Sequence, residues 1–169
     1  GIHWKWQGPV LDMMCDTQNN AFYDEKSNKY KLFVRYAHGG RRAVGMTEGT
    51  EFNINKLPHP QIVFEPDPQD KPSLDIYTIA YARHPEYKNV NYNLVCQDSI
   101  DPRGRVASIT RHDGRDMHFM LPSRFDRERG PIDIQIAVSR DGKHWFRPER
   151  KAVIPVGQHT GISSVYAFP

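Results

Sequence analysis

The stretch PIDIQIAVSRDGKHWFRPERKAVIP, residues 131–155, decides the fold of this chain. Apolar and polar residues alternate over 132–138, which predicts a β-strand with one buried face. The following SRDG, residues 139–142, predicts a tight turn, because Ser and Asp side chains bond to nearby backbone and glycine accepts a positive φ. An aromatic pair at 145–146 and a short β-prone run at 152–155 complete a predicted β-hairpin unit.

A weaker copy of this hairpin occurs earlier in the chain. AVGMTEGTEF at 43–52 parallels AVSRDGKHWF at 137–146, since in both an Ala-Val strand end leads through a glycine-containing polar turn to an aromatic residue. Each copy is followed by a short β-prone run, QIVF at 61–64 and KAVIP at 151–155. A repeated four-stranded antiparallel meander is typical of a β-propeller blade, so the sequence predicts an all-β fold built of such blades.

The blade period divides the chain into about two units with flanks. A blade takes about forty to fifty residues and a closed propeller at least four blades, so we expect a single, partial propeller-like domain. Its parts are a leading segment 1–15, a first blade 16–64, a connector 65–73, a second blade 74–155 with an insertion at 97–116, and the start of a third blade at 156–169.

Composition narrows the possible partners. The 169 residues carry a formal net charge of +3, with basic and acidic residues interspersed, so no contiguous basic face for nucleic acid is expected. No apolar run is long enough for a transmembrane helix, so no membrane partner is expected. Cys15 and Cys96 lie far apart without metal-ligand spacing, and either one disulfide or two buried thiols fits the pattern. Oligomeric state stays open.

Several stretches together resemble the five-bladed β-propeller glycoside hydrolases of the family 43 and 32 type, and most closely uncharacterised bacterial members of that group. They are DTQNNAFYDEKSNKYKLFVR (16–35), RRAVGMTEGTEF (41–52), LDIYT (74–78), MLPSRF (120–125) and GPIDIQIAVSRDGKHWFRP (130–148). SRDGKHW is also similar to the Asp-box hairpin of sialidase propellers. The resemblance implies hydrolysis of O-glycosyl bonds by carboxylates at the blade starts, a carbohydrate partner and no cofactor, and it favours an extracellular or periplasmic location.

Glycoside hydrolysis needs one carboxylate to attack or to activate water and one carboxylic acid to protonate the leaving oxygen. Residues that match blade starts are Asp16, as base or nucleophile, and Asp75, as the second carboxylate. The alternatives are a turn acid for Asp16 and a strand-start cap for Asp75. Expected substrate-binding residues are Gln18, Asn19, Tyr77 and Arg124. A structural Ca²⁺ on HDGRDMH, residues 112–118, is a further possibility, with a solvated polar hairpin as its alternative.

The tail strand ISSVYAF at 162–168 has no Asp or Glu where a third acid is expected, which leaves the enzyme assignment open. A non-catalytic propeller that binds carbohydrate or protein is therefore one rival hypothesis, and a β-sandwich is another. The strand order separates them, because the propeller hypothesis requires residues 21–64 to form one antiparallel meander. Trp4 and Trp6 are expected in the core, although exposed aromatic rings could stack on sugars.

Overall fold

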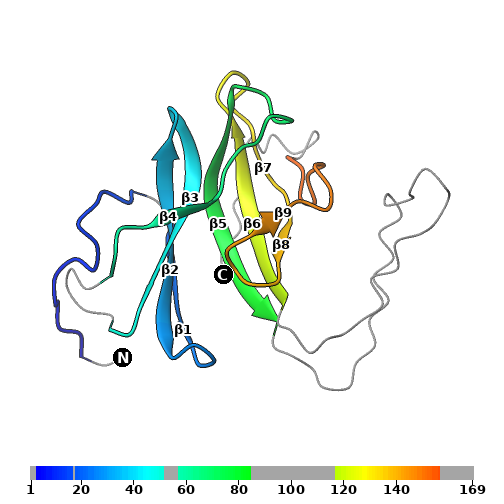
Figure 1. The fold of residues 1–169 in the computed structure, drawn as a ribbon. Coiled ribbons are helices and arrows are strands. Elements are labelled where there is room, and N and C mark those ends of the chain that lie inside the picture. The colour runs from blue at the N-terminus through cyan, green and yellow to red at the C-terminus, as the bar shows by residue number, and fades with distance from the viewer. Residues whose placement is uncertain (1–2, 17, 52–56, 85–116, 157–169) are drawn as a thin grey trace, which may run out of the picture.

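The computed structural model describes residues 3–16, 18–51, 57–84 and 117–156, and within these ranges the chain is all-β with no helix. The described residues contain nine strands, which form two antiparallel sheets that stand side by side (Figure 1). The described part contains no closed sheet, so the two sheets are open. The predicted all-β class is confirmed.

The first sheet is a meander in sequence order, β1 (Asn20–Asp24), β2 (Lys29–His38), β3 (Arg41–Gly49) and β4 (Gln61–Phe64). Gly39 and Gly40 form the two-residue turn between β2 and β3, and both have the positive φ that this hairpin requires. Asp24 closes the turn before β2 by accepting hydrogen bonds from Ser27 Oγ at 2.7 Å and from Lys26 N at 3.2 Å. The predicted antiparallel meander over residues 21–64 is confirmed.

The second sheet is built around two long strands, β5 (Leu74–His84) and β6 (Met117–Asp126). β7 (Ile132–Ile134) and β8 (Ala137–Ser139) both pair with β6, and β9 (Trp145–Phe146) pairs with β8. An isolated bridge from Ile134 to Ile154 places residues after β9 beside β7. The expected insertion at 97–116 and Cys96 lie outside the described residues.

The predicted strand over 132–138 is interrupted. β7 and β8 keep one continuous register on β6, but the ladder breaks at Gln135, whose N–H binds the carbonyl of Pro122 at 3.0 Å. Pro122 has no N–H to donate in return. The prediction that one face stays buried along the whole of 132–138 is wrong in its second half. Beyond Gln135 the buried residues are Ala137 and Ser139, while Val138 is half-buried.

The SRDG turn forms as predicted. Gly142 has φ +72°, and its N–H binds Ser139 Oγ at 2.9 Å. Asp141 accepts hydrogen bonds from the backbone N–H groups of Lys143 and His144, both at 2.8 Å. The role of Asp141 is therefore structural.

The two sheets pack face to face around an aromatic core. Phe22 of the first sheet stacks on Tyr81 of the second, Phe33 contacts Tyr81 with the rings tilted by 37°, and Trp145 meets Phe33 edge-on. Asn20 bridges the sheets by donating to Ile79 O at 2.9 Å and accepting from Tyr81 N at 3.3 Å. This pairing fixes how the first strand of one sheet lies against the first strand of the other.

The opposite face of the first sheet is covered by the leading segment. Val10, Leu11 and Cys15 pack on a small cluster formed by Leu32, Val34 and Leu57. The expectation that Trp4 and Trp6 are core residues is wrong, since they are 90% and 82% exposed. They precede the short apolar run that reaches the sheet, and nothing in the described chain covers them.

Candidate functional site

Asp16, the first expected catalytic residue, lies at the end of the leading segment and is 55% exposed. Its carboxylate forms an ion pair with Arg35 of β2, whose Nη1 lies 2.6 Å away. The backbone N–H of Arg35 donates to Asn19 Oδ1 at 3.3 Å, so Asn19 ties the segment to the same strand. Asp16 therefore presents an anchored carboxylate to solvent.

Asp75, the second expected carboxylate, has the opposite environment. It is 1% exposed at the start of β5 and accepts hydrogen bonds from Arg42 of β3, from Nη1 at 2.6 Å and from the backbone N–H at 3.2 Å. Arg127 Nε lies 3.7 Å from the same carboxylate. Both carboxylate oxygens thus accept hydrogen bonds from Arg42, across the sheet interface.

Tyr77 joins these two ion pairs. The guanidinium carbons of Arg35 and Arg42 lie 5.2 and 5.1 Å from its ring centre, within cation–π range. β5 carries a β-bulge at this position, because Ile76 pairs with Arg124 and Thr78 with the adjacent Ser123, leaving Tyr77 as the additional residue. A bulge redirects a side chain, which explains why Tyr77 reaches the arginines of the first sheet.

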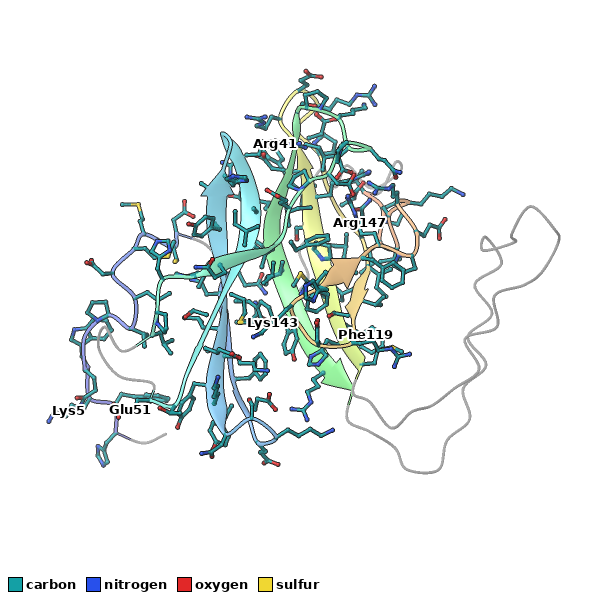
Figure 2. All side chains as sticks on the ribbon, viewed as in Figure 1. Lys5, Arg41, Glu51, Phe119, Lys143 and Arg147 are labelled. Atoms are coloured by element: carbon teal, nitrogen blue, oxygen red, sulfur yellow. The ribbon has the colours of Figure 1, made fainter. Side chains whose placement is uncertain are left out.

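The contacts run from Asp16 through Arg35, Tyr77 and Arg42 to Asp75 and define what we call the arginine–tyrosine cluster. The structure thus links both predicted carboxylates and predicted Tyr77 at one end of the sheet interface. Figure 2 shows the part of the interface near the labelled Arg41, the neighbour of Arg42. Asp16 and Asp75 are connected through three side chains rather than by direct contact.

The other expected binding residues lie in different surroundings. Gln18 lines a crevice with Arg35 and Tyr77 that has no room for a water molecule. Arg124 pairs through two nitrogens with Asp133, at 2.9 Å for Nε, and lines a separate cavity of about 390 Å³ with Lys71 and Asp126. A ligand at the arginine–tyrosine cluster would therefore approach the exposed Asp16 side and not an enclosed cavity.

Cys15 adjoins Asp16 but is a poor nucleophile. Burial raises the pKa of its thiol, and the neighbouring Asp16 carboxylate raises it further. Nucleophilic thiol chemistry requires the thiolate, which both effects disfavour. Cys15 is a free thiol that packs under the first sheet.

The described ranges contain no group of three His, Cys, Asp or Glu side chains that could hold a metal ion. Most of the possible Ca²⁺ loop, 112–116, lies outside these ranges, and its last residue, His118, is buried and hydrogen-bonded to Tyr81. No helix of the described chain could span a bilayer.

A second charged group, formed by Asp67, Asp70, Arg147 and Arg150, is structural. Arg147 Nη2 lies 2.8 Å from Asp67 and also binds Asp70, while Arg150 Nη1 binds Asp70 at 3.2 Å. Arg147 and Asp70 are almost fully buried. The group fastens the connector between the sheets to the segment after β9.

The arginines of the cluster are the site residues that the sequence did not reveal. Arg35 lies on β2, which is buried on both faces, since Leu32 and Val34 are buried on one face and Phe33 on the other. Because burying an unpaired charge is costly, a strand that is buried on both faces can carry a cationic side chain only where a carboxylate from another segment pairs with it. That partner, Asp75, is 33 residues from Arg42 in sequence.

Searches against family models, curated proteins and solved structures find no match to this chain. The likeness to propeller glycoside hydrolases therefore rests on the quoted sequence motifs.

Proposed function

We propose that this chain forms two neighbouring blades of a five-bladed β-propeller of the glycoside hydrolase type, and that it binds a carbohydrate at the arginine–tyrosine cluster. Two features support the fold. Each sheet follows a meander of antiparallel strands, and the sheets pack face to face, with β5 against β3 and Asn20 of β1 bonded to the backbone of β5.

The observation that carries the functional proposal is the position of Asp16. It is an exposed carboxylate, held at 2.6 Å by Arg35, whose guanidinium carbon lies 5.2 Å from the centre of the Tyr77 ring that a bulge in β5 redirects. A fixed, solvent-exposed carboxylate matches the needs of a sugar, which offers hydroxyl donors. Such pre-positioning lowers the cost of ordering side chains on binding.

The two carboxylates take different roles in this proposal. Asp16 contacts the ligand, as an acceptor for sugar hydroxyls or as the base or nucleophile of hydrolysis. Asp75 is enclosed by Arg42 and Arg127, so it positions Arg42 against Tyr77 rather than touching the sugar. A hydrolase would then need its general acid from residues outside this cluster.

Non-catalytic carbohydrate binding is the second candidate, and the burial of Asp75 favours it. Hydrolysis requires two carboxyl groups that reach the glycosidic oxygen and the anomeric carbon from opposite sides. The cluster offers one accessible carboxylate. Binding needs no more than that.

Asp16→Asn distinguishes these functions. The chain and this variant are assayed with 4-nitrophenyl furanosides and pyranosides, and binding of the corresponding methyl glycosides is measured by saturation-transfer NMR. A hydrolase should lose about 10²–10⁴-fold in turnover, the usual contribution of an acid–base group, while retaining sugar binding. A binding protein should show no hydrolysis and weaker binding in the variant.

Asp12→Asn is the matched control, because Asp12 is an exposed carboxylate of the same leading segment. It should leave hydrolysis and binding unchanged. If Asp16→Asn also changes neither, Asp16 has no role in ligand contact and the proposed site is wrong.

A further inference from the structure

A second cavity lies away from the arginine–tyrosine cluster. It measures about 640 Å³ and lies between β3, β4 and the β8–β9 hairpin. This volume is within the range of about 300–1,000 Å³ that small-molecule sites occupy. Figure 2 shows Lys143, one of its lining residues, between the two sheets and well away from Arg41. Glu48, which lines this cavity, is six positions from Arg42 along β3, about 20 Å of extended strand.

The cavity combines an apolar floor with a polar rim. Met46, Val63 and Trp145 supply apolar surface, and Gln61 and Lys143 supply hydrogen-bonding groups. The Trp145 ring meets Phe33 at 79° and Tyr81 at 77°, and its indole N–H is bound to Gly142 O at 3.0 Å. The indole therefore has a fixed orientation, set by the core on one side and by the hairpin on the other.

The acidic group at the rim of the cavity is already paired. Glu48 accepts hydrogen bonds from Lys29 at 3.2 Å and Lys143 at 3.1 Å. Burial opposes ionisation of Glu48, but these two lysines outweigh it and hold the pKa of its carboxyl below the usual range. Lys143 uses one of its three donors on Glu48, which leaves donors for a ligand. These donors suit a neutral ligand with hydroxyl groups, because a hydroxyl oxygen accepts hydrogen bonds.

We propose that this cavity is a second carbohydrate-binding site, which holds one neutral sugar ring against Trp145 and hydrogen-bonds its hydroxyls with Gln61 and Lys143. It is independent of Asp16, and a protein with both sites would contact one extended glycan, or two glycans, at separate points. The hairpin that repeats along the sequence then builds a binding surface as well as a blade edge.

The indole N–H resonance of Trp145 reports directly on this cavity. Methyl glycosides of glucose, galactose, mannose, xylose and arabinose are titrated into ¹⁵N-labelled protein, and the signal is assigned with Trp4→Phe and Trp6→Phe, which alter exposed positions. We expect at least one glycoside to shift the Trp145 signal saturably. The double variant Gln61→Leu/Lys143→Ala should weaken that binding about tenfold, the effect of two lost hydrogen bonds.

Two control variants should leave this site unchanged, and a third variant should block it. Asp16→Asn should leave the Trp145 titration unchanged, and Lys151→Ala, which removes an exposed lysine outside the cavity, should do the same. Ile62→Trp, which fills the cavity from its half-buried wall, should abolish the shift while preserving the thermal unfolding transition.

The outcomes are distinct. Glycosides that bind or are hydrolysed in an Asp16-dependent way without shifting Trp145 overturn the second site and leave the proposed function standing. A Trp145 shift with unchanged affinity in the double variant overturns the proposed contacts. No shift with any of the five glycosides also overturns the proposal.

Discussion

Asp75→Asn tests whether charge pairing across the two sheets stabilises the fold. Asp75 is 1% exposed and takes two hydrogen bonds from Arg42. The amide keeps the shape of the side chain but removes its charge, so the Arg42 cation loses its counterion. Removing one partner of a fully buried pair costs about 3–5 kcal/mol. Arg42 is 31% exposed and regains some hydration, which reduces our expected loss to about 2–3 kcal/mol.

Urea unfolding followed by circular dichroism measures this loss. With a slope of about 2 kcal/mol per molar urea, the midpoint should fall by about 1–1.5 M. Asp16→Asn is the control, because Asp16 makes the same 2.6 Å contact with Arg35 but is 55% exposed, and we expect it to cost less than about 1 kcal/mol. Equal losses in the two variants would refute the argument that burial gives the Asp75 pair its weight.

The double variant Arg42→Met/Asp75→Leu addresses the origin of the loss. Replacing both partners of a buried ion pair by apolar residues is often neutral or stabilising, because no charge is left without a counterion. We expect this variant to unfold at a higher urea concentration than Asp75→Asn. A midpoint below that of Asp75→Asn would mean that the packing around these side chains, and not the charge, controls stability.

Three further results are expected from thermal unfolding. Arg147→Met should lower the free energy of unfolding by about 2–3 kcal/mol, since it leaves the buried Asp70 carboxylate with only the partly exposed Arg150 as its cation; an unchanged midpoint would contradict this. Gly45→Ala should cost about 1–3 kcal/mol, because its Cβ would lie 3.0 Å from the Tyr36 ring. Hydrogen bonds from Arg150 and neighbours hold the pKa of Asp67 below its usual range, so its contribution is present above about pH 4 and is lost as the pH falls further. The midpoint should be level between about pH 7 and 5 and lower at about pH 3.

The features that the sequence predicted well are local. The turn at 139–142 follows from backbone preferences and side-chain bonds within a few residues, and it formed as expected. The meander of β1 to β4 follows from such turns between β-prone runs. Strands that are joined by a short turn usually pair with each other as neighbours in one sheet.

The features that the sequence did not predict depend on what lies across the interface. Alternation over 132–138 predicted one strand, but Pro122 on the partner strand interrupts the ladder. Trp4 and Trp6 were expected in the core on composition, yet the leading segment contacts the sheet only from Val10 onward. Both errors concern contacts between segments that are far apart in sequence, about which local periodicity contains no information.

The interface itself suggests why its candidate site is rigid. Its centre is apolar, around Phe33 and Tyr81, and charge pairs lie toward its ends, with Asp24–Arg83 on one side and Asp75–Arg42 on the other. A shift of one sheet against the other would separate both pairs and leave buried charges without partners, which costs several kcal/mol. The packing register is therefore fixed by the same arginine that contacts Tyr77, so the architecture of the interface and the preorganisation of the proposed sugar site have one physical cause.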